Sequence, residues 1–345
     1  MTQIKILLTG AGAPGGPGII KALLAIPEFD LWIADADANA SGRGLLPEKF
    51  VQIPTATEAG FVDAIVQICE QKGIQVVLPL VTLELFQFAA CKADFAHKNI
   101  AIVVSENSAL KIANNKRLLL EHLQTHDIDV PVFLKANTWD ELKTAVHALG
   151  YPQKLVCIKP SVSNGSRGFR ILDSRYNPFT SFFKEKPNNT TTTLANLEPI
   201  FRGNEFSEML VTAHLPGDEY TIDALVYQNK PLLILPRKRI AMNNGITIKG
   251  QFLQIPSIIE LCQKVLGSLL LEGPIGIQVK ANQEGQYQIL EINPRLQGTS
   301  IAAMGLGINL PALAVYAALG MEGELVLPEI CWGLQFARYY DEIYF

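Results

Sequence analysis

The sequence predicts an α/β protein with a doubly wound, Rossmann-like parallel sheet at its amino terminus and a mixture of helices and antiparallel hairpins after it. Three observations predict this class. A buried strand pattern at residues 4–9 runs into a glycine-rich turn and then a helical pattern. Short apolar runs alternate with helical runs up to about residue 104. After residue 155, apolar runs occur in pairs that are separated by short turns containing glycine.

The composition limits the class of protein. A chain of 345 residues with 48% hydrophobic residues is long enough for two or three domains with large cores. The net charge of -4 and the lack of a long basic run argue against nucleic-acid binding. We expect a cytoplasmic protein, because the five cysteines are scattered and the amino terminus has no signal-peptide pattern. We expect no membrane partner, because glycine and proline interrupt the apolar stretch at 301–319.

The first turn has two interpretations. Gly10, Gly12 and Gly15 match G-x-G-x-x-G, and the acidic Asp35 follows the next strand pattern. These residues can bind a dinucleotide, with its pyrophosphate at the start of the helix. The alternative is a turn whose glycines serve only tight packing. The glycine pattern by itself favours the dinucleotide site.

The next elements continue the α/β alternation. Residues 61–72 and 83–96 have helical patterns, and residues 75–79 and 100–104 have strand patterns. Glu84 lies where a strand passes into a helix. It is placed to reach a site at the strand end, although an acidic residue there also stabilises a helix start.

Two lysines in the middle of the chain stand out. Asn115 is placed to cap a helix over 116–125, and Lys116 then lies in the first turn, where the helix dipole disfavours a cation. Lys159 ends a strand over 155–160 and is followed by the small-residue loop 161–168, whose backbone N–H groups suit phosphate. The polar residues 184–199 predict a loop.

Two further groups carry chemistry. Arg237 and Arg239 lie on one face of a predicted strand, and such cations can stabilise phosphoryl transfer and hold an acidic substrate. Residues 274–293 read as a hairpin. With a turn centred on residues 284–285, opposed residue numbers sum to 569, so that Gln278, Glu291 and Asn293 share one side and Gly276 leaves open space. Three oxygen donors around a gap suit Mg²⁺.

The run Glu291-Ile-Asn293-Pro294-Arg295 resembles the metal-binding signature of ATP-grasp ligases. Together with Gln278, it is similar to the large chain of carbamoyl-phosphate synthase and its short, single-module relatives. The resemblance covers nearly the whole chain. It implies a Rossmann-like domain at 1–113, a lid-bearing ATP-grasp subdomain at 114–206 and a metal-binding subdomain at 207–345, with ATP sandwiched between the two subdomains.

The resemblance also implies roles for individual residues. Arg295 and Arg239 are expected to be catalytic, and Ala213 departs from the Glu of many members, so that adenine recognition must rest on the backbone there. The other implied residues are Lys116, Lys159, Ser163, Gly165 and Ser166 for phosphate, Val211, Thr212, Ala213 and His214 for adenine, Glu219 for ribose, and Gln278, Glu291 and Asn293 for metal.

The implied activity is ATP-dependent formation of an acyl phosphate from a carboxylate, followed by attack of an amine or ammonia. The implied cofactors are ATP and two Mg²⁺ ions, with Mn²⁺ as a substitute, and the partners are small-molecule substrates and, in a homodimer, a second copy. Two other functions stay open: an NAD-dependent oxidoreductase that uses the Gly10–Gly15 turn, and an ATP sensor without turnover.

Overall fold

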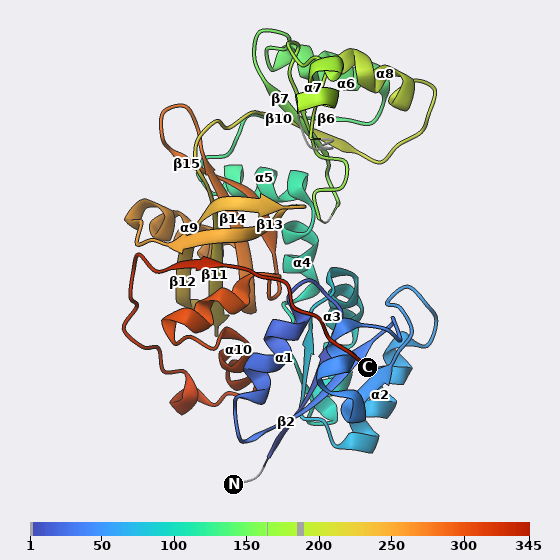
Figure 1. The fold of residues 1–345 in the computed structure, drawn as a ribbon, viewed down its shortest axis with the longest axis vertical. Helices are drawn as coiled ribbons and strands as arrows, with labels where there is room; N and C mark the ends of the chain where they lie inside the picture. Colours follow the sequence, from blue (N-terminus) through green and yellow to red (C-terminus); the bar gives the residue numbers. More distant parts are fainter. Residues whose placement is uncertain (1–2, 164, 185–189) are drawn as a thin grey trace. The chain divides into compact units, whose positions relative to one another are not determined.

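The computed structural model describes residues 3–163, 165–184 and 190–345 (Figure 1). The chain divides into two compact units. Unit 1 comprises Met1–Lys111, Tyr220–Ile277 and Ile292–Phe345. Unit 2 comprises Ile112–Glu219 and Gln278–Glu291. The three-part division at residues 113 and 206 stays a prediction.

The amino-terminal sheet of unit 1 is parallel and doubly wound, which confirms the expected fold class. Its strand order is β3-β2-β1-β4-β5, so the chain reverses its direction of winding between β1 and β4. The strands are β1 (Ile4–Thr9), β2 (Phe29–Asp35), β3 (Phe50–Gln52), β4 (Val76–Pro79) and β5 (Ala101–Ile102), and the helices are α1 (Gly16–Leu24), α2 (Phe61–Lys72), α3 (Thr82–His97) and α4 (Asn107–Ala113). The β1 side chains are buried except for Lys5, as expected for a central strand covered on both faces.

A second sheet has the order β15-β14-β11-β12-β13-β16, and its strands β14 and β15 continue from unit 1 into unit 2. The strands are β11 (Glu219–Tyr227), β12 (Lys230–Asn243), β13 (Ile246–Phe252), β14 (Gly273–Ala281), β15 (Tyr287–Asn293) and β16 (Gln335–Ala337). Helix α9 (Pro256–Ser268) precedes β14, and the 3₁₀ helix η3 (Ser300–Leu306) and α10 (Leu310–Ala318) follow β15.

The carboxyl-terminal part of unit 1 packs against its amino-terminal sheet. Asn309 Nδ2 donates a 2.8 Å hydrogen bond to the Ala22 carbonyl at the end of α1. Tyr316 Oη donates a 2.6 Å hydrogen bond to Glu28, and its ring lies 5.2 Å from that of Phe29. Buried side chains of β1, α1, η3 and α10 form one hydrophobic core. Residues 287 and 288 positions apart in sequence therefore stabilise one unit.

Unit 2 contains a mixed sheet of order β6-β10-β7-β8-β9. The strands are β6 (Phe133–Ala136), β7 (Val156–Pro160), β8 (Arg170–Leu172), β9 (Thr191–Thr192) and β10 (Met209–Ala213), and the helices are α5 (Lys116–Thr125), α6 (Trp139–Ala148), α7 (Pro178–Lys184) and α8 (Leu194–Phe201). The loop expected over 184–199 is wrong at its end, because Thr193 caps α8 by accepting a 3.2 Å hydrogen bond from Asn196 N. Residues 185–189 lie outside the described residues.

Short 3₁₀ helices complete the secondary structure at η1 (Ser41–Leu45), η2 (Pro47–Lys49) and η4 (Glu322–Glu324). Across the described ranges, no single helix is long and apolar enough to cross a membrane. The bent pair Ser300–Leu306 and Leu310–Ala318 meets that criterion only when its two helices are taken together.

Candidate active site

Unit 2 brings together Lys116, the loop after β7 and the β15 residues Leu290 and Glu291. Asn115 caps α5 by accepting hydrogen bonds from two backbone N–H groups, as predicted, and this places Lys116 at the first helical position. The Lys116 side chain is buried, and its Nζ donates a 2.7 Å hydrogen bond to the Ser163 carbonyl. Lys116 Nζ also lies 3.7 Å from Glu291 Oε2. Residues 116, 163 and 291, far apart in sequence, therefore meet at one point.

Lys159 is the second cation of this cluster. It lies opposite Leu210 in the pairing of β7 with β10, and its Nζ donates a 3.2 Å hydrogen bond to the Leu290 carbonyl. Burial lowers the pKa of the Lys159 ammonium to about 8, while the Glu291 carboxylate opposes this shift and Lys116 adds to it. Two ammonium groups thus flank one carboxylate in a partly buried place.

The loop after β7 turns sharply at three positions. Gly165, Ser166 and Gly168 have positive φ angles of 63°, 59° and 76°. A side chain at Gly168 would meet the Pro160 ring at 2.7 Å, so the loop folds tightly over the end of β7. The backbone N of Lys116 donates a 2.8 Å hydrogen bond to the Ser161 carbonyl, which fixes the start of the loop to α5.

The first residue of β11 supplies an acid, and β14 supplies a further cation beside it. Glu219 Oε2 lies 3.8 Å from Lys280 Nζ, and the backbones at Gly217 and Ala281 are joined by a 3.0 Å hydrogen bond. His214 is half-buried, and burial, helped by Lys280, lowers its pKa. Sequence reasoning missed Lys280, although strand alternation already placed it on the same face of β14 as Gln278.

The backbone of β10 limits how it can recognise adenine. Val211 pairs with Ile158 on one side and Leu134 on the other, and Thr212 pairs likewise with Cys157 and Phe133. Their main-chain groups are therefore used within the sheet. Pairing on both sides argues against base recognition by the backbone of Val211 and Thr212, whose adenine contacts stay predictions. Contacts from Ala213 and His214, at the end of the strand, stay predictions.

The hairpin turn has a different register from the expected one. Asn282 N donates a 2.8 Å hydrogen bond to the Gln286 carbonyl, and Gly285 N donates to the Asn282 carbonyl. The loop therefore holds three residues, with Gly285 left-handed at φ 79°, and opposed numbers at the turn sum to 568. The expected sum of 569 is wrong at the turn. The turn therefore no longer supports the prediction that Gln278 lies opposite Glu291.

The space beside Gly276 is also used differently from the expectation. A side chain at Gly276 would lie 2.1 Å from the Gln297 side chain. Gln297 is buried, and its Nε2 donates a 3.2 Å hydrogen bond to Asp223 Oδ1. Gly276 therefore makes room for Gln297 within unit 1, not for a ligand beside Asn293.

The three predicted metal residues fit Mg²⁺ by their chemistry, and their grouping stays a prediction. Gln278, Glu291 and Asn293 offer two amide oxygens and one carboxylate, all partly exposed, and Mg²⁺ prefers such hard oxygen ligands. Glu291 and Asn293 lie two positions apart on β15 and so project to one side. Among the described residues, no group of three His, Cys, Asp or Glu side chains could hold a metal, so the amide oxygens are essential to this assignment.

Arg295 follows β15 and lies in unit 1. Its Nε donates a 3.0 Å hydrogen bond to Thr82 Oγ1, and its Nη1 donates a 2.9 Å hydrogen bond to the Leu296 carbonyl. These contacts restrict the guanidinium at the start of α3. The sequence had not indicated Thr82, because the two residues are 213 positions apart.

The two arginines of β12 have different environments. Arg237 is fully buried and forms a 2.9 Å ion pair with Asp223, which also accepts a 2.6 Å hydrogen bond from Ser300 Oγ. Arg237 is therefore engaged in the core of unit 1, which corrects its place in a ligand-binding pair. Arg239 Nη2 donates a 2.5 Å hydrogen bond to the Gly245 carbonyl, and its catalytic role stays a prediction.

The amino-terminal glycine turn is explained by packing. A side chain at Gly15 would lie 2.6 Å from the Gly298 carbonyl oxygen, and Gly15 has a φ of 119°. Asp35 Oδ2 accepts a 2.8 Å hydrogen bond from Gly12 N, and Asp35 Oδ1 accepts one of 2.9 Å from Asp37 N. The glycines and the acid of the pattern thus make contacts within unit 1 that account for them without a ligand.

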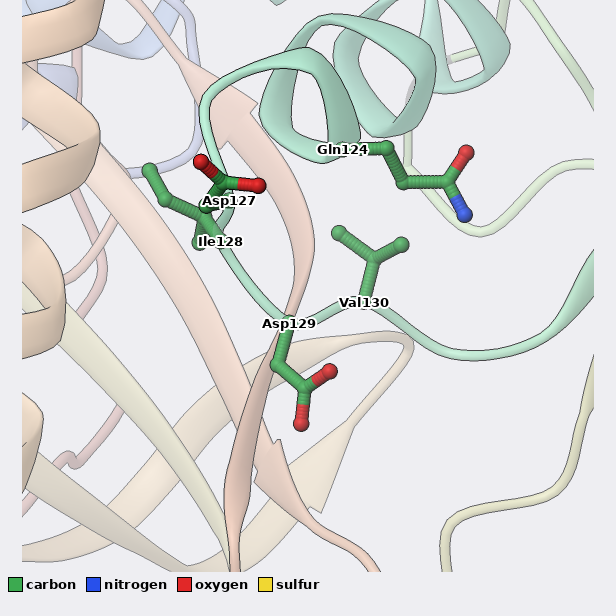
Figure 2. A pocket seen from close by; sticks show the side chains of 5 residues that line it. All are labelled: Gln124, Asp127, Ile128, Asp129 and Val130. Atoms are coloured by element: carbon green, nitrogen blue, oxygen red, sulfur yellow. The ribbon is translucent and has the colours of Figure 1, made fainter.

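An open hollow of about 410 Å³ lies elsewhere in unit 2, after the end of α5 (Figure 2). It is lined by Gln124, Asp127, Ile128, Asp129 and Val130. Figure 2 shows the Asp127 and Asp129 carboxylates pointing away from each other. None of the predicted site residues lines it, so it is not the candidate site.

Comparisons with known proteins agree with this fold. The family described as ATP-grasp in the biosynthetic pathway with Ter operon matches residues 205–337, and the family described as PylC-like, N-terminal domain matches residues 18–103. The large chain of carbamoyl phosphate synthase from Bifidobacterium adolescentis is 25% identical over 242 residues, which cover 66% of this chain. This chain spans about a fifth of the length of that relative.

Solved structures share the fold at low identity. N5-carboxyaminoimidazole synthetase from Staphylococcus aureus complexed with ADP superimposes with a TM-score of 0.67 and 14% identity, covering 95% of this chain and 79% of that one. L-amino acid ligase from Bacillus licheniformis superimposes with a TM-score of 0.66 and 15% identity, covering 92% and 76%.

Proposed function

We propose that this chain, whose residues 205–337 match a family of ATP-grasp proteins, is an ATP-dependent ligase that joins a carboxylate to an amine or ammonia. The observation that carries the proposal is the cluster of Lys116, Lys159 and Glu291 in unit 2. Two cations and one carboxylate match the charges of a metal-bound triphosphate: the ammonium groups attract phosphate oxygens, and the carboxylate attracts the metal.

Each part of unit 2 has a proposed role toward ATP. Lys116 and Lys159 hold phosphate oxygens, and the loop with Ser163, Gly165 and Ser166 covers them. Ala213 and His214 contact the adenine, and Glu219 contacts the ribose hydroxyls with Lys280 beside it. Gln278, Glu291 and Asn293 would hold two Mg²⁺ ions, or Mn²⁺ in their place. When bound, the metals would neutralise charge on the β- and γ-phosphates.

The chemistry requires positioning more than covalent catalysis. A carboxylate oxygen of the acid attacks the γ-phosphate, and the bond to the bridging oxygen breaks with release of ADP. The resulting acyl phosphate is then attacked by the amine nitrogen with release of phosphate. Arg295 binds the carboxylate and acyl-phosphate oxygens, because its guanidinium is already restrained by Thr82 and Leu296. Arg239 supplies a second cation. We place the reaction in the cytoplasm, on small-molecule substrates.

The carbamoyl-phosphate-synthase-like form of this reaction is a narrower proposal. It is supported by 25% identity over 242 residues to that large chain, of which this chain spans about a fifth. The oxidoreductase alternative has less support, because packing against Gly298 and hydrogen bonds to Asp35 account for the glycine turn.

Calorimetric titration with ATP in the presence and absence of Mg²⁺ tests the proposal. We expect the wild type to bind Mg-ATP and Glu291→Gln to bind it at least tenfold more weakly, because a neutral amide binds Mg²⁺ less strongly than a carboxylate. Glu284→Gln, in the exposed hairpin turn, is the matched control and should bind like the wild type. Binding of NADH but not of Mg-ATP by the wild type would instead support the oxidoreductase.

A further inference from the structure

The first turn of α3 carries a buried carboxylate to which the proposed roles assign no function. Glu84 is 5% exposed, and the Thr9 hydroxyl donates a 2.5 Å hydrogen bond to its Oε2 atom. Thr9 is the last residue of β1, and α3 follows directly after β4. The Glu84 carboxylate therefore lies at the carboxyl ends of two neighbouring parallel strands of unit 1.

These two strands flank the reversal point of the sheet. The chain places β2 and β3 on one side of β1, and β4 and β5 on the other. In open α/β sheets, ligands bind in the crevice that this reversal leaves outside the carboxyl ends of the strands. A buried carboxylate is costly unless it is paired or used. The position of Glu84 thus points to a ligand.

Arg295 connects the same helical turn to the proposed reaction. Thr82 lies two residues before Glu84, and its Oγ1 accepts the 3.0 Å hydrogen bond from Arg295 Nε. The first turn of α3 therefore holds the guanidinium that we assign to the activated acid and also carries a carboxylate. Arg295 and Glu84 are thus both linked to the start of α3, which follows β4.

We propose that Glu84 accepts the proton of the attacking amine, and that the second substrate is an amine that binds against the first turn of α3. This inference rests on the proposed ligase function. In the step, the nitrogen lone pair forms the C–N bond to the acyl carbon. The C–O bond to the phosphate breaks, and its electron pair leaves with the phosphate. One N–H proton passes to the Glu84 carboxylate.

The groups around Glu84 suit a proton acceptor. Burial raises the pKa of Glu84 to about 7, the Thr9 hydroxyl opposes this shift, and Asp35 adds to it. Thr9 belongs to β1, Asp35 ends β2, and Arg295 is linked to this turn through Thr82. A base with a pKa near the working pH combines a sufficient charged fraction with a strong affinity for the proton.

Two nucleophiles separate the formation of the acyl phosphate from the attack by the amine. Hydroxylamine is unprotonated at neutral pH and attacks acyl phosphates without a base, so its hydroxamate product reports on the first step alone. Wild type, Glu84→Gln and the control Asp94→Asn, an exposed carboxylate on the same helix, are assayed with ATP, Mg²⁺ and a panel of carboxylic acids. The panel comprises the twenty standard amino acids and simple mono- and dicarboxylic acids. The second nucleophile is ammonia, supplied as an ammonium salt, or the amino group of glycine.

We expect Glu84→Gln to form hydroxamate within about twofold of the wild type and to form amide about 100-fold more slowly near neutral pH. The control should match the wild type in both reactions. Wild-type rates of amide formation in Glu84→Gln overturn the inference, and so does a loss of both products in a variant that stays folded. If the wild type forms no hydroxamate with any acid, the ligase function itself fails and the inference fails with it.

Thr9→Val provides a second variant that does not depend on the folding of Glu84→Gln. Removal of the hydroxyl removes a hydrogen bond that lowers the pKa of Glu84. The acid limb of the pH–rate profile for amide formation should therefore move to higher pH, while hydroxamate formation keeps its profile. An unmoved acid limb overturns the inference.

Discussion

The pH dependence of stability tests the environment of Glu84 without knowledge of any substrate. Burial is the largest cause that raises its pKa from 4.5 to about 7. Because the folded protein holds this proton more tightly than the unfolded chain, wild-type stability decreases as the pH rises through that interval. At 1.36 kcal/mol per pKa unit, the loss between about pH 5 and about pH 8 is about 2.5 kcal/mol. Glu84→Gln does not titrate and avoids this loss.

The assay is urea unfolding of wild type and Glu84→Gln at both pH values. The quantity of interest is the difference in free energy of unfolding between the two proteins, because the other titrating groups contribute equally to both and cancel. We expect this difference to shift in favour of Glu84→Gln by about 2.5 kcal/mol at the higher pH. Asp94→Asn, exposed on the same helix, should show no such shift. A difference that is the same at both pH values refutes the assigned environment of Glu84.

Three further predictions concern unit 1. Asp223→Asn should lower the free energy of unfolding by about 3–5 kcal/mol, because it leaves the buried Arg237 without its counter-ion. The double variant Asp223→Leu with Arg237→Met should be more stable than Asp223→Asn in the same urea titration. Gly15→Ala should lower the free energy of unfolding by about 2 kcal/mol more than the control Gly60→Ala. Both glycines have a positive φ, but only a side chain at Gly15 would meet a backbone atom, the Gly298 carbonyl oxygen at 2.6 Å. Equal losses for the two variants in urea unfolding would contradict this reason. Thr82→Val removes the hydroxyl that holds Arg295 and should raise the KM for the carboxylic acid about tenfold, with a smaller effect on the KM for ATP. Thr82→Ser keeps the hydroxyl and should retain both wild-type values. A change confined to the KM for ATP would be inconsistent with positioning of Arg295.

The local elements were predictable because their signals are local. The bounds of α2 (Phe61–Lys72) and α5 (Lys116–Thr125) were predicted to the residue. Glycines on either side end α2, and the Asn115 side chain starts α5, so the residues that decide these bounds adjoin the helices. The buried strand β1 was predictable for the same reason, and so was the alternation of strands and helices in the amino-terminal sheet. The spacing of apolar residues along the chain distinguishes these strands from the helices.

Register and partners were less predictable. The β14–β15 hairpin was expected, but its turn has three residues, because the Asn282 side chain accepts hydrogen bonds from Glu284 N and Gln286 N and favours the longer loop. A shift of one residue changes which side chains are opposed, and the run of apolar residues around this turn does not reveal it. The sequence pattern therefore located the candidate metal residues without establishing their mutual geometry.

The sequence by itself determined the class of fold, the order of the motifs and the residue types of the candidate site, because strand and helix periods and caps depend on neighbours along the chain. Only the tertiary structure decided which groups share one environment. It placed Lys116 beside Glu291, paired Arg237 with Asp223, and filled the space at Gly276 with Gln297. These are contacts between residues far apart in the chain, where burial and packing, and not local propensity, select the partner.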